Sequence, residues 1–410
     1  MARTVAGLPE GSRITDFISL GVVSEKVPLE KVQRILTQTG RQSQRQRNLP
    51  AHVMVYYVIA LALYMEVSYG EVLRCLLEGL EWLGLEVRRI RNTGRSGISR
   101  ARARLGVEPL RKLYDEVVVP IATPETKGAW YRRWRLVSID GTTLHTADTK
   151  GNLEAFGRPG SGRGQSGFPQ IRVVSLVENG THVLFGARHG SYKSGESTLA
   201  REVLSNLREG MLCMADRGFF GYELWKHAGT TGADQLWRVK KNLRLPCMKR
   251  LPDGSYLSKV YPSDKDRRHD RERIVVRVIE YRLEGVEEAE PLYRLITGIL
   301  DPVQAPAEEL AALYHERWEI ETAFDELKTH LRGRSIVLRS KSPELVRQEF
   351  YGLMLAHFAV RGLMHEAALK AGIDPDKVSF VHSVRVVRRK LPAYVSFPPS
   401  EKEGVPSAGS

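Results

Sequence analysis

The chain has few cysteines, no long apolar run and fewer acidic than basic residues. Its three cysteines, Cys75, Cys213 and Cys247, are widely separated and form no Cys-x-x-Cys pair. They indicate a reducing compartment and argue against a structural zinc site. The longest apolar run, residues 53–65, covers thirteen residues and is too short to cross a bilayer. The first ten residues lack a long apolar core, so we expect no secretory signal and a cytoplasmic protein.

The excess of basic residues predicts a polyanionic partner. The chain carries 62 Lys and Arg against 48 Asp and Glu, which gives a formal net charge of +14 and a pI near 9.7. Nucleic acid is the favoured partner, and an acidic membrane surface is the alternative. With 410 residues and 42% hydrophobic content, the chain can form two or three cores.

Apolar periodicity predicts a helical domain over residues 1–125, with helices near Val32, over 53–65 and 69–83, and over 98–105 and 109–119. Seven arginines fall between positions 88 and 104. Three of them, Arg100, Arg102 and Arg104, surround the fourth of these helices. A helix-turn-helix interpretation places this helix on DNA; the alternative is a solvated surface helix.

Two aspartates follow short apolar runs. Residues 136–139 lead into Asp140-Gly, and residues 211–215 lead into Asp216. Such runs predict buried strands that each deliver a carboxylate at the strand end. A single aspartate at a strand end is more often a cap or turn residue, so the significance of this pair depends on a third feature.

That feature is the segment 311–330, which holds an aromatic hydroxyl, a guanidinium, a carboxylate and an ammonium at Tyr314, Arg317, Glu321 and Lys328. On a regular helix these four fall within an arc of roughly 60°. A solvated charged face is the ordinary interpretation. Together with Asp140 and Asp216, however, Glu321 would complete a set of three carboxylates able to bind two hard divalent cations at a phosphodiester.

The order Asp140-Gly, Asp216-Arg-Gly and Tyr-x2-Arg-x3-Glu-x6-Lys resembles the bacterial insertion-sequence transposases of the DDE type, in particular the fourth insertion-sequence family. The stretches near Arg104, at residues 154–161 and at 236–240 also resemble this family, so that the similarity covers roughly residues 11–391. It implies that Asp140, Asp216 and Glu321 are catalytic and bind two Mg²⁺ ions, with Mn²⁺ as a substitute.

The resemblance also implies partners and further contacts. The N-terminal domain would recognise the terminal inverted repeats, and two copies would form a homodimer in the synaptic complex with double-stranded DNA, associated with the nucleoid. Tyr314, Arg317 and Lys328 would grip the phosphates at the cut and stabilise a hairpin end. Active cut-and-paste transposition is the favoured function; a DNA-binding descendant without activity and a nuclease that only hydrolyses are the alternatives.

The strand and helix pattern divides the chain into an α+β or α/β arrangement. Three strands, a helix and a fourth strand over residues 130–220 have the order of an RNase H-like core. We expect residues 221–305 to form a β-rich insertion, residues 306–395 to hold the catalytic helix and C-terminal helices, and residues 396–410 to be a disordered tail.

Within the insertion, Trp237, Arg238 and Lys240 are candidate DNA contacts. The family resemblance implies that a tryptophan there can stack on a base flipped out of the DNA. Alternation puts Trp237 on the strand face opposite Arg238 and Lys240, so a core tryptophan is the alternative.

Three other carboxylates compete with Glu321 in the catalytic segment. Asp325 lies only about 40° from it on a regular helix, and geometry alone does not exclude Asp325 as the ligand. Glu319 and Glu326 lie on other faces, where we expect them to be solvated.

Overall fold

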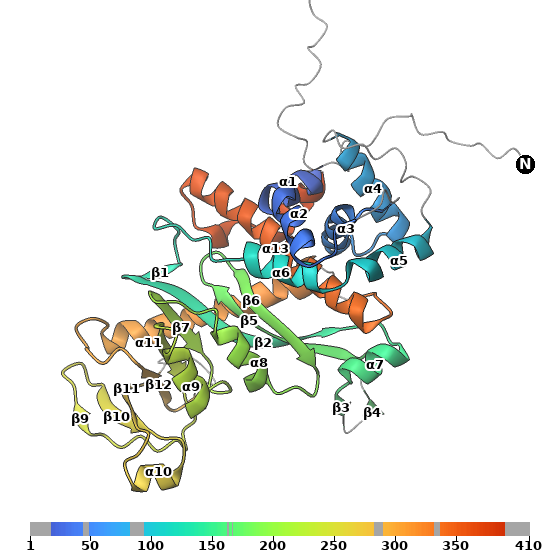
Figure 1. Cartoon of the computed structure of the whole chain (residues 1–410). Coiled ribbons are helices and arrows are strands. Elements are labelled where there is room, and N and C mark those ends of the chain that lie inside the picture. Colours follow the sequence, from blue (N-terminus) through green and yellow to red (C-terminus); the bar gives the residue numbers. More distant parts are fainter. Residues whose placement is uncertain are drawn as a thin grey trace, which may run out of the picture.

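The computed structural model describes residues 18–43, 49–82, 94–161, 164–165, 167–282, 290–331 and 337–389. The predicted tail, residues 396–410, lies outside the described residues. The molecule combines an N-terminal group of helices, a large mixed sheet and a C-terminal group of helices, as the sequence pattern predicts (Figure 1). In the part of the chain that is described, no helix is both long and apolar enough to cross a membrane.

The N-terminal region is helical, as predicted. Its helices are α1 (Ile18–Lys26), α2 (Leu29–Gln38), α3 (Ala51–Leu63), α4 (Tyr69–Trp82), α5 (Arg95–Leu105) and α6 (Glu108–Val117). The amphipathic α2 buries Val32, Ile35 and Leu36 on one side. The thirteen-residue apolar run forms α3, which is buried on nearly all sides and is the centre of this domain.

The central sheet has the strand order β6-β5-β2-β7-β8-β12-β11-β10-β9. The first five strands in this order are β6 (Val183–Ser191), β5 (Gln170–Glu178), β2 (Trp134–His145), β7 (Met211–Ala215) and β8 (Asp234–Arg238), and the short β1 (Trp130–Tyr131) pairs with β2. Strands β6, β5 and β2 pair antiparallel, whereas β7 and β8 run parallel to β2. This is the arrangement of an RNase H-like core, and it confirms the predicted fold.

Strand β8 corrects the predicted start of the insertion at residue 221. It runs parallel to β7 and reaches that position through α9 (Tyr222–Gly229), the helical crossover that parallel neighbours need. Residues 222–238 therefore belong to the core. The insertion adds β9 (Lys249–Arg250), β10 (Tyr256–Val260), α10 (Asp264–Arg268), β11 (Ile274–Tyr281) and β12 (Tyr293–Thr297), and its strands extend the same sheet by antiparallel pairing.

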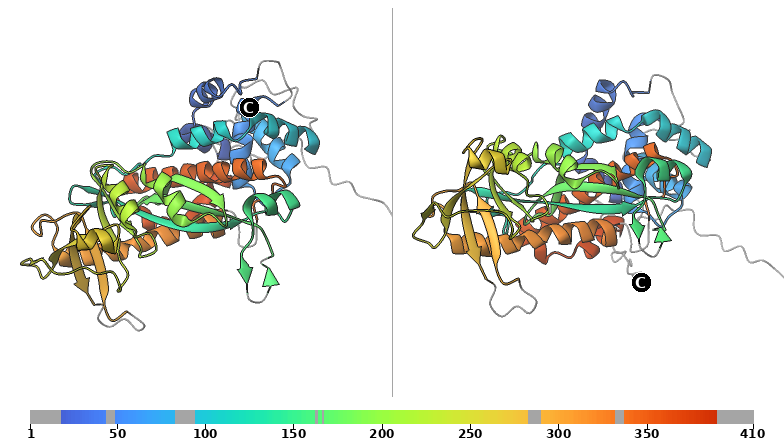
Figure 2. Two further views of the ribbon diagram at one scale, coloured as in Figure 1. Left: turned by 60° about the horizontal axis from the view of Figure 1, so that its bottom comes forward. Right: turned by 90° about the horizontal axis from the view of Figure 1, so that it is seen from below.

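The two faces of the sheet pack against different helices because side chains alternate along each strand. Leu136, Met214 and Leu236 pack against Leu310 and Leu313 of α11 (Ala307–His315). The opposite face belongs to the large core that includes α8 (Glu196–Leu204), α9 and the N-terminal helices. Figure 2 shows the sheet between the N-terminal helices on one side and α11 on the other.

The C-terminal helix α13 (Pro343–Ala371) joins the N-terminal helices to the sheet, because it packs on α3, α6 and β6. A Cβ at Gly352 would lie 2.6 Å from the Val58 carbonyl oxygen, so glycine allows the close crossing of α13 and α3. The chain ends its described part with α14 (Phe380–Arg389). Helix α7 (Lys150–Phe156) and the hairpin of β3 (Gly160–Ser161) and β4 (Gly164–Gln165) project at the far edge (Figure 2).

Candidate active site

Asp140 and Asp216 lie side by side on neighbouring parallel strands. Ile139 of β2 pairs with Ala215 of β7, so the next residue on each strand takes the corresponding position and points to the same face. The prediction that the first strand ends at Asp140 is wrong, because β2 continues to His145 in its pairing with β5. Only the pairing with β7 stops after Ile139, and this opens the position that the two carboxylates share.

Glu321 approaches these aspartates from an interrupted helix. The segment 307–331 is not the single regular helix that the spacing predicts: α11 is followed by a 3-10 turn at Glu316–Trp318, by α12 (Glu319–Asp325) and by a π-helical turn at Glu326–Leu331. The 3-10 turn directs Arg317 toward the sheet. Its Nη1 lies 3.3 Å from Asp140 Oδ2, and its Nη2 lies 3.9 Å from Glu321 Oε1, so that one guanidinium joins the strand carboxylate to the helix carboxylate.

The electrostatics of the site tie the three carboxylates together. Burial raises the pKa of Asp140; the Gly141 N–H and the Arg317 charge oppose this rise, and the negative charges of Asp216 and Glu321 add to it. Asp216 is half-buried, and its Oδ1 accepts a hydrogen bond of 2.7 Å from the Gly218 N–H. Glu321 is 50% exposed and open to solvent. Three carboxylates that repel one another on one face form a site that attracts cations.

Two known protein families match this chain. Residues 133–359 match the family model described as the transposase DDE domain, and residues 17–115 match the insertion element 4 transposase N-terminal domain. The chain belongs to the IS4 family of DDE transposases. It is therefore the transposase of an insertion sequence, with a DNA-binding N-terminal domain and a catalytic domain that cleaves and transfers DNA strands.

Individual relatives agree. The transposase is 29% identical over 371 residues to the transposase InsG for insertion sequence element IS4 of Escherichia coli K12, covering 88% of this chain and 80% of that protein. It is 25% identical over 227 residues to the putative transposase InsZ of the same organism, covering 53% of this chain and 71% of the relative. Among solved structures, a cryo-EM structure of a piggyBac transposase synaptic complex with hairpin DNA matches with a TM-score of 0.43 and 13% identity, over 92% of this chain and 78% of that one.

The DDE domain implies dependence on a divalent metal ion. The residues present fit such an ion, because Asp140 and Asp216 share one sheet face and Arg317 brings Glu321 to it. Carboxylate oxygens are the ligands that hard divalent cations prefer.

The other carboxylates of the segment have separate structural partners. Asp325 accepts a hydrogen bond of 2.6 Å from the Thr329 hydroxyl on its own helix. The prediction that Glu319 and Glu326 are solvated is wrong. Glu326 is 5% exposed and bonded to Arg361 of α13, and Glu319 accepts from the Gly180 N–H. The π-helical turn, which the sequence period did not reveal, turns Glu326 inward.

Tyr314 lies in the core rather than on the open face expected from the motif. It is 6% exposed, and its hydroxyl donates a 3.2 Å hydrogen bond to the carbonyl of Ala215, the residue before Asp216. The Arg317 guanidinium lies 5.9 Å from its ring. Tyr314 therefore positions Asp216 and Arg317 and does not itself offer a surface to DNA.

Trp237 is also in the core, which is the second of the two alternatives that its sequence context leaves open. It is 0% exposed and packs edge-on against Trp225 of α9 at 5.3 Å. Its register with Ala215 puts it on the sheet face opposite Asp140 and Asp216. Arg238 is on the same sheet face as Asp216, beside its position, and pairs there with Glu290 at 2.6 Å. Lys240 is exposed two residues later.

Trp318 is the aromatic residue that sequence reasoning missed. It is 59% exposed, directly follows Arg317, and lies 5.8 Å from that guanidinium. The available signal was a tryptophan directly after the arginine of the catalytic motif. Lys328 is partly buried in the π-helical turn, and its contact with DNA stays a prediction.

The three arginines of α5 that are predicted to contact DNA do not share one environment. Arg100 and Arg104 are exposed. Arg102 is 3% exposed and donates to Gln348 Oε1, Ser340 Oγ and the Leu345 carbonyl near the start of α13. The prediction that Arg102 contacts DNA is therefore contradicted, because its side chain holds two domains together.

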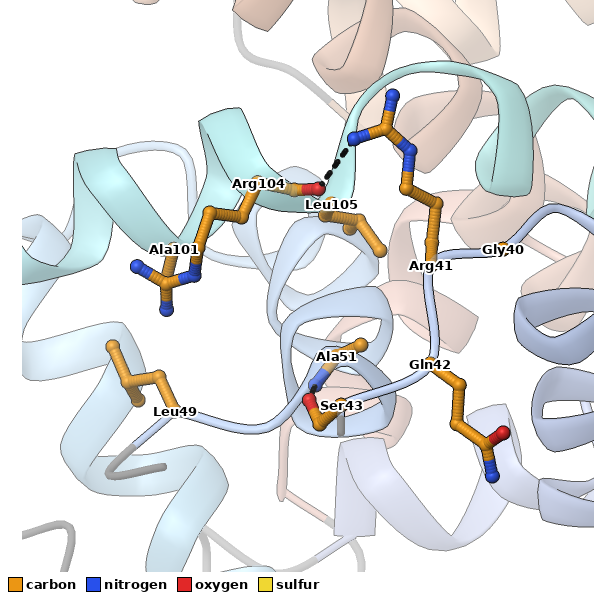
Figure 3. Close-up of a pocket in the computed structure, with 9 residues that line it drawn as sticks. All are labelled: Gly40, Arg41, Gln42, Ser43, Leu49, Ala51, Ala101, Arg104 and Leu105. Carbon is orange, nitrogen blue, oxygen red and sulfur yellow. Dashed lines mark hydrogen bonds between the residues drawn. The ribbon is translucent and has the colours of Figure 1, made fainter. Parts of the chain in front are cut away.

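Arg104 lines a pocket of about 310 Å³ between α5 and the segment that links α2 to α3. Figure 3 shows Arg41 on that linking segment, where its Nη1 donates a 3.0 Å hydrogen bond to the Arg104 carbonyl. The two guanidinium groups point to different sides of the pocket (Figure 3), and each suits a phosphate of DNA.

Proposed function

We propose that this transposase cuts both strands at each end of its insertion sequence through a hairpin intermediate and then joins the ends to target DNA. The observation that carries the proposal is the convergence of Asp140, Asp216 and Glu321 through Arg317. Each carboxylate comes from a different place in the fold: Asp140 from β2, Asp216 from the end of β7 and Glu321 from α12.

The reaction would proceed by successive attacks on phosphorus. In the first step a water oxygen attacks, and the 3′ oxygen leaves as a hydroxyl. That hydroxyl then attacks the opposite strand, closing a hairpin and releasing the flanking DNA. Water reopens the hairpin, and the same 3′ hydroxyl attacks the target phosphodiester.

Asp140, Asp216 and Glu321 would hold two Mg²⁺ ions, or Mn²⁺ in their place. When bound, such a pair activates the attacking oxygen and stabilises the leaving oxygen. Arg317 would then exchange its contact with Asp140 for a phosphate oxygen, a ligand that suits a guanidinium in the same way. Arg238 and Lys328 would supply further positive charge at the cut.

Hairpin closure bends the backbone sharply and unstacks a base. We assign the stacking surface for that base to Trp318, because its ring is exposed beside Arg317. Base-to-aromatic stacking contributes about 1–3 kcal/mol per base, so loss of the ring would slow the step that needs the flipped base.

Arg41, Arg100 and Arg104 would contact the phosphates of the inverted repeats. One set of three carboxylates serves one DNA end, so two copies of the chain would form a homodimer in the synaptic complex, bound to nucleoid DNA.

The test is a time course with end-labelled DNA that carries the flanking repeats, with and without Mg²⁺, read on a denaturing gel. Nicked DNA, then hairpin, then opened and joined products are expected. Arg317→Ala or Lys328→Ala should slow hairpin formation more than the first nick, and equal slowing of both steps would reject their role in the hairpin. Binding without cleavage would identify an inactive descendant, and cleavage without joining a hydrolytic nuclease.

A further inference from the structure

A second group of metal-ligand side chains lies behind the catalytic helix, apart from the three catalytic carboxylates. It comprises His182 in the β5–β6 turn, Glu319 at the start of α12 and Asp376 in a 3-10 turn at Pro375–Lys377. One ligand atom from each lies within 4.8 Å of the others. Three segments far apart in the sequence thus converge on one point.

The spacing suits a tetrahedral ion. His182 Nε2 lies 3.1 Å from Asp376 Oδ1 and 3.8 Å from Glu319 Oε2. Zinc ligands at about 2.0–2.1 Å from the ion stand roughly 3.4 Å from one another at a tetrahedral angle. Both distances from His182 are near that value.

His182 directs an unpaired polar atom into this point. The residue is 3% exposed, and its Nε2 is buried without a hydrogen-bond partner. Asp376 Oδ1 is close enough to accept from it but lies outside hydrogen-bond geometry. A buried ring nitrogen left without a partner is costly, and a metal ion would satisfy it.

The opposite ring nitrogen is arranged to support a metal ligand. His182 Nδ1 lies 3.3 Å from Glu326 Oε1 and is also in contact with the Arg361 guanidinium. The Arg361 guanidinium can only donate and the Glu326 carboxylate can only accept, so Nδ1 serves one of them at a time; in the tautomer that donates to Glu326, the Nε2 lone pair is available to a metal ion. Donation of the second ring N–H to a carboxylate is the usual arrangement of histidines that bind metals.

The charges around the group are unbalanced. Three carboxylates face one guanidinium. A second histidine beside His182 is buried, and burial lowers its pKa, so it carries no charge near neutral pH. These residues are Glu319, Glu326, Asp376, Arg361 and His357. Leaving His182 aside, three formal negative charges against one positive charge give an excess of two, the charge that one divalent cation cancels.

We propose that His182, Glu319 and Asp376 bind a divalent transition-metal ion at a structural site distinct from the catalytic one. Imidazole favours zinc over magnesium, and a water would complete the tetrahedron. No cysteine takes part, so the scarcity of cysteine excludes only thiolate sites. The ion would fix the first turn of α12, two residues before Glu321, to the β5–β6 turn and the C-terminal segment. This inference does not rest on the transposition chemistry.

The experiment measures zinc binding by the full-length protein after removal of metals with a chelator. Bound zinc is quantified by mass spectrometry after gel filtration, and the melting temperature is recorded with Zn²⁺ or Mg²⁺. We expect about one zinc per chain and a rise in melting temperature with Zn²⁺. A variant with Asp140→Asn, Asp216→Asn and Glu321→Gln should keep both responses, because it alters only the catalytic carboxylates.

Asp376→Asn should weaken zinc binding at least about tenfold, and its 35% exposed side chain makes loss of the fold a minor concern. The matched control is Asp325→Asn, an exposed carboxylate outside the group on α12, the helix that holds Glu319, and this variant should bind zinc as the parent does. His182→Asn should abolish the response. Equal zinc content in the parent and Asp376→Asn, or no zinc in the parent, would overturn the proposal and leave Nε2 as a proton donor to the carboxylates.

Discussion

Replacement of Arg102 by alanine separates a structural arginine from DNA-binding arginines in the same helix. The substitution removes the donors to Gln348 Oε1 at 3.2 Å, to Ser340 Oγ at 3.2 Å and to the Leu345 carbonyl at 2.8 Å. Each buried acceptor left without a partner costs about 1–3 kcal/mol. After partial relaxation we expect Arg102→Ala to lower the free energy of unfolding by roughly 3–5 kcal/mol.

Arg104→Ala, two residues further along the same helix, is the matched control. Its side chain is exposed, so its effect on stability should stay within about 0.5 kcal/mol. Its effect on DNA binding should be the larger one: loss of one phosphate contact lowers the slope of log K against log salt by roughly 0.9. Arg102→Ala should leave that slope unchanged.

The assays are urea unfolding of both variants and binding to inverted-repeat DNA over a series of salt concentrations. Arg102→Lys keeps the positive charge but loses the forked donors, so it should be destabilised and yet bind with the parent slope. If Arg102→Ala kept its stability and lost about 0.9 of slope, our assignment of Arg102 to the domain junction would be wrong.

Three further results are expected. Because burial raises the pKa of Asp140, its ionised form is disfavoured in the metal-free fold, and Asp140→Asn should raise the free energy of unfolding in chelator at pH 7. This gain should vanish as the pH falls below the usual aspartate pKa. A loss of stability would show instead that the pair with Arg317 dominates. Trp318→Ala should accumulate nicked DNA on gels and leave the free energy of unfolding unchanged, while Trp237→Ala should lower that free energy by about 3–5 kcal/mol in urea unfolding. The reverse pattern would identify Trp237 as the stacking residue. Tyr314→Phe should slow cleavage without weakening DNA binding, because only the support of Ala215 is lost, and weakened binding in a gel-shift assay would instead indicate a direct DNA contact.

The succession of three strands, a helix and a fourth strand along the chain was predictable from local patterns, whereas the choice of Glu321 over Asp325 rested on the resemblance to a known family. Short apolar runs before Asp140 and Asp216 reflect strands buried on both faces, and that signal survives in a single sequence. The alternation of apolar and basic residues around Trp237 allowed a core position for its side chain, which the structure shows. The long apolar run of α3 also identified a buried helix.

Features that depend on distant segments were not predictable. Arg102 has the sequence context of a surface arginine, and only the approach of α13 buries it. Glu326 was assigned to solvent by regular helical geometry, but the π-helical turn rotates it toward Arg361. The fifth core strand was placed in the insertion because a parallel partner cannot be distinguished from an antiparallel one in its own sequence.

The most direct test of the catalytic assignment is Mg²⁺-dependent cleavage of inverted-repeat DNA by Asp140→Ala, Asp216→Ala and Glu321→Ala, with Asp325→Ala as the control. The account predicts that each of the first three loses cleavage while DNA binding is retained, and that Asp325→Ala keeps most of its activity. Cleavage at the parent rate by any one of the three, with protein that binds DNA normally, would contradict the assignment of that carboxylate.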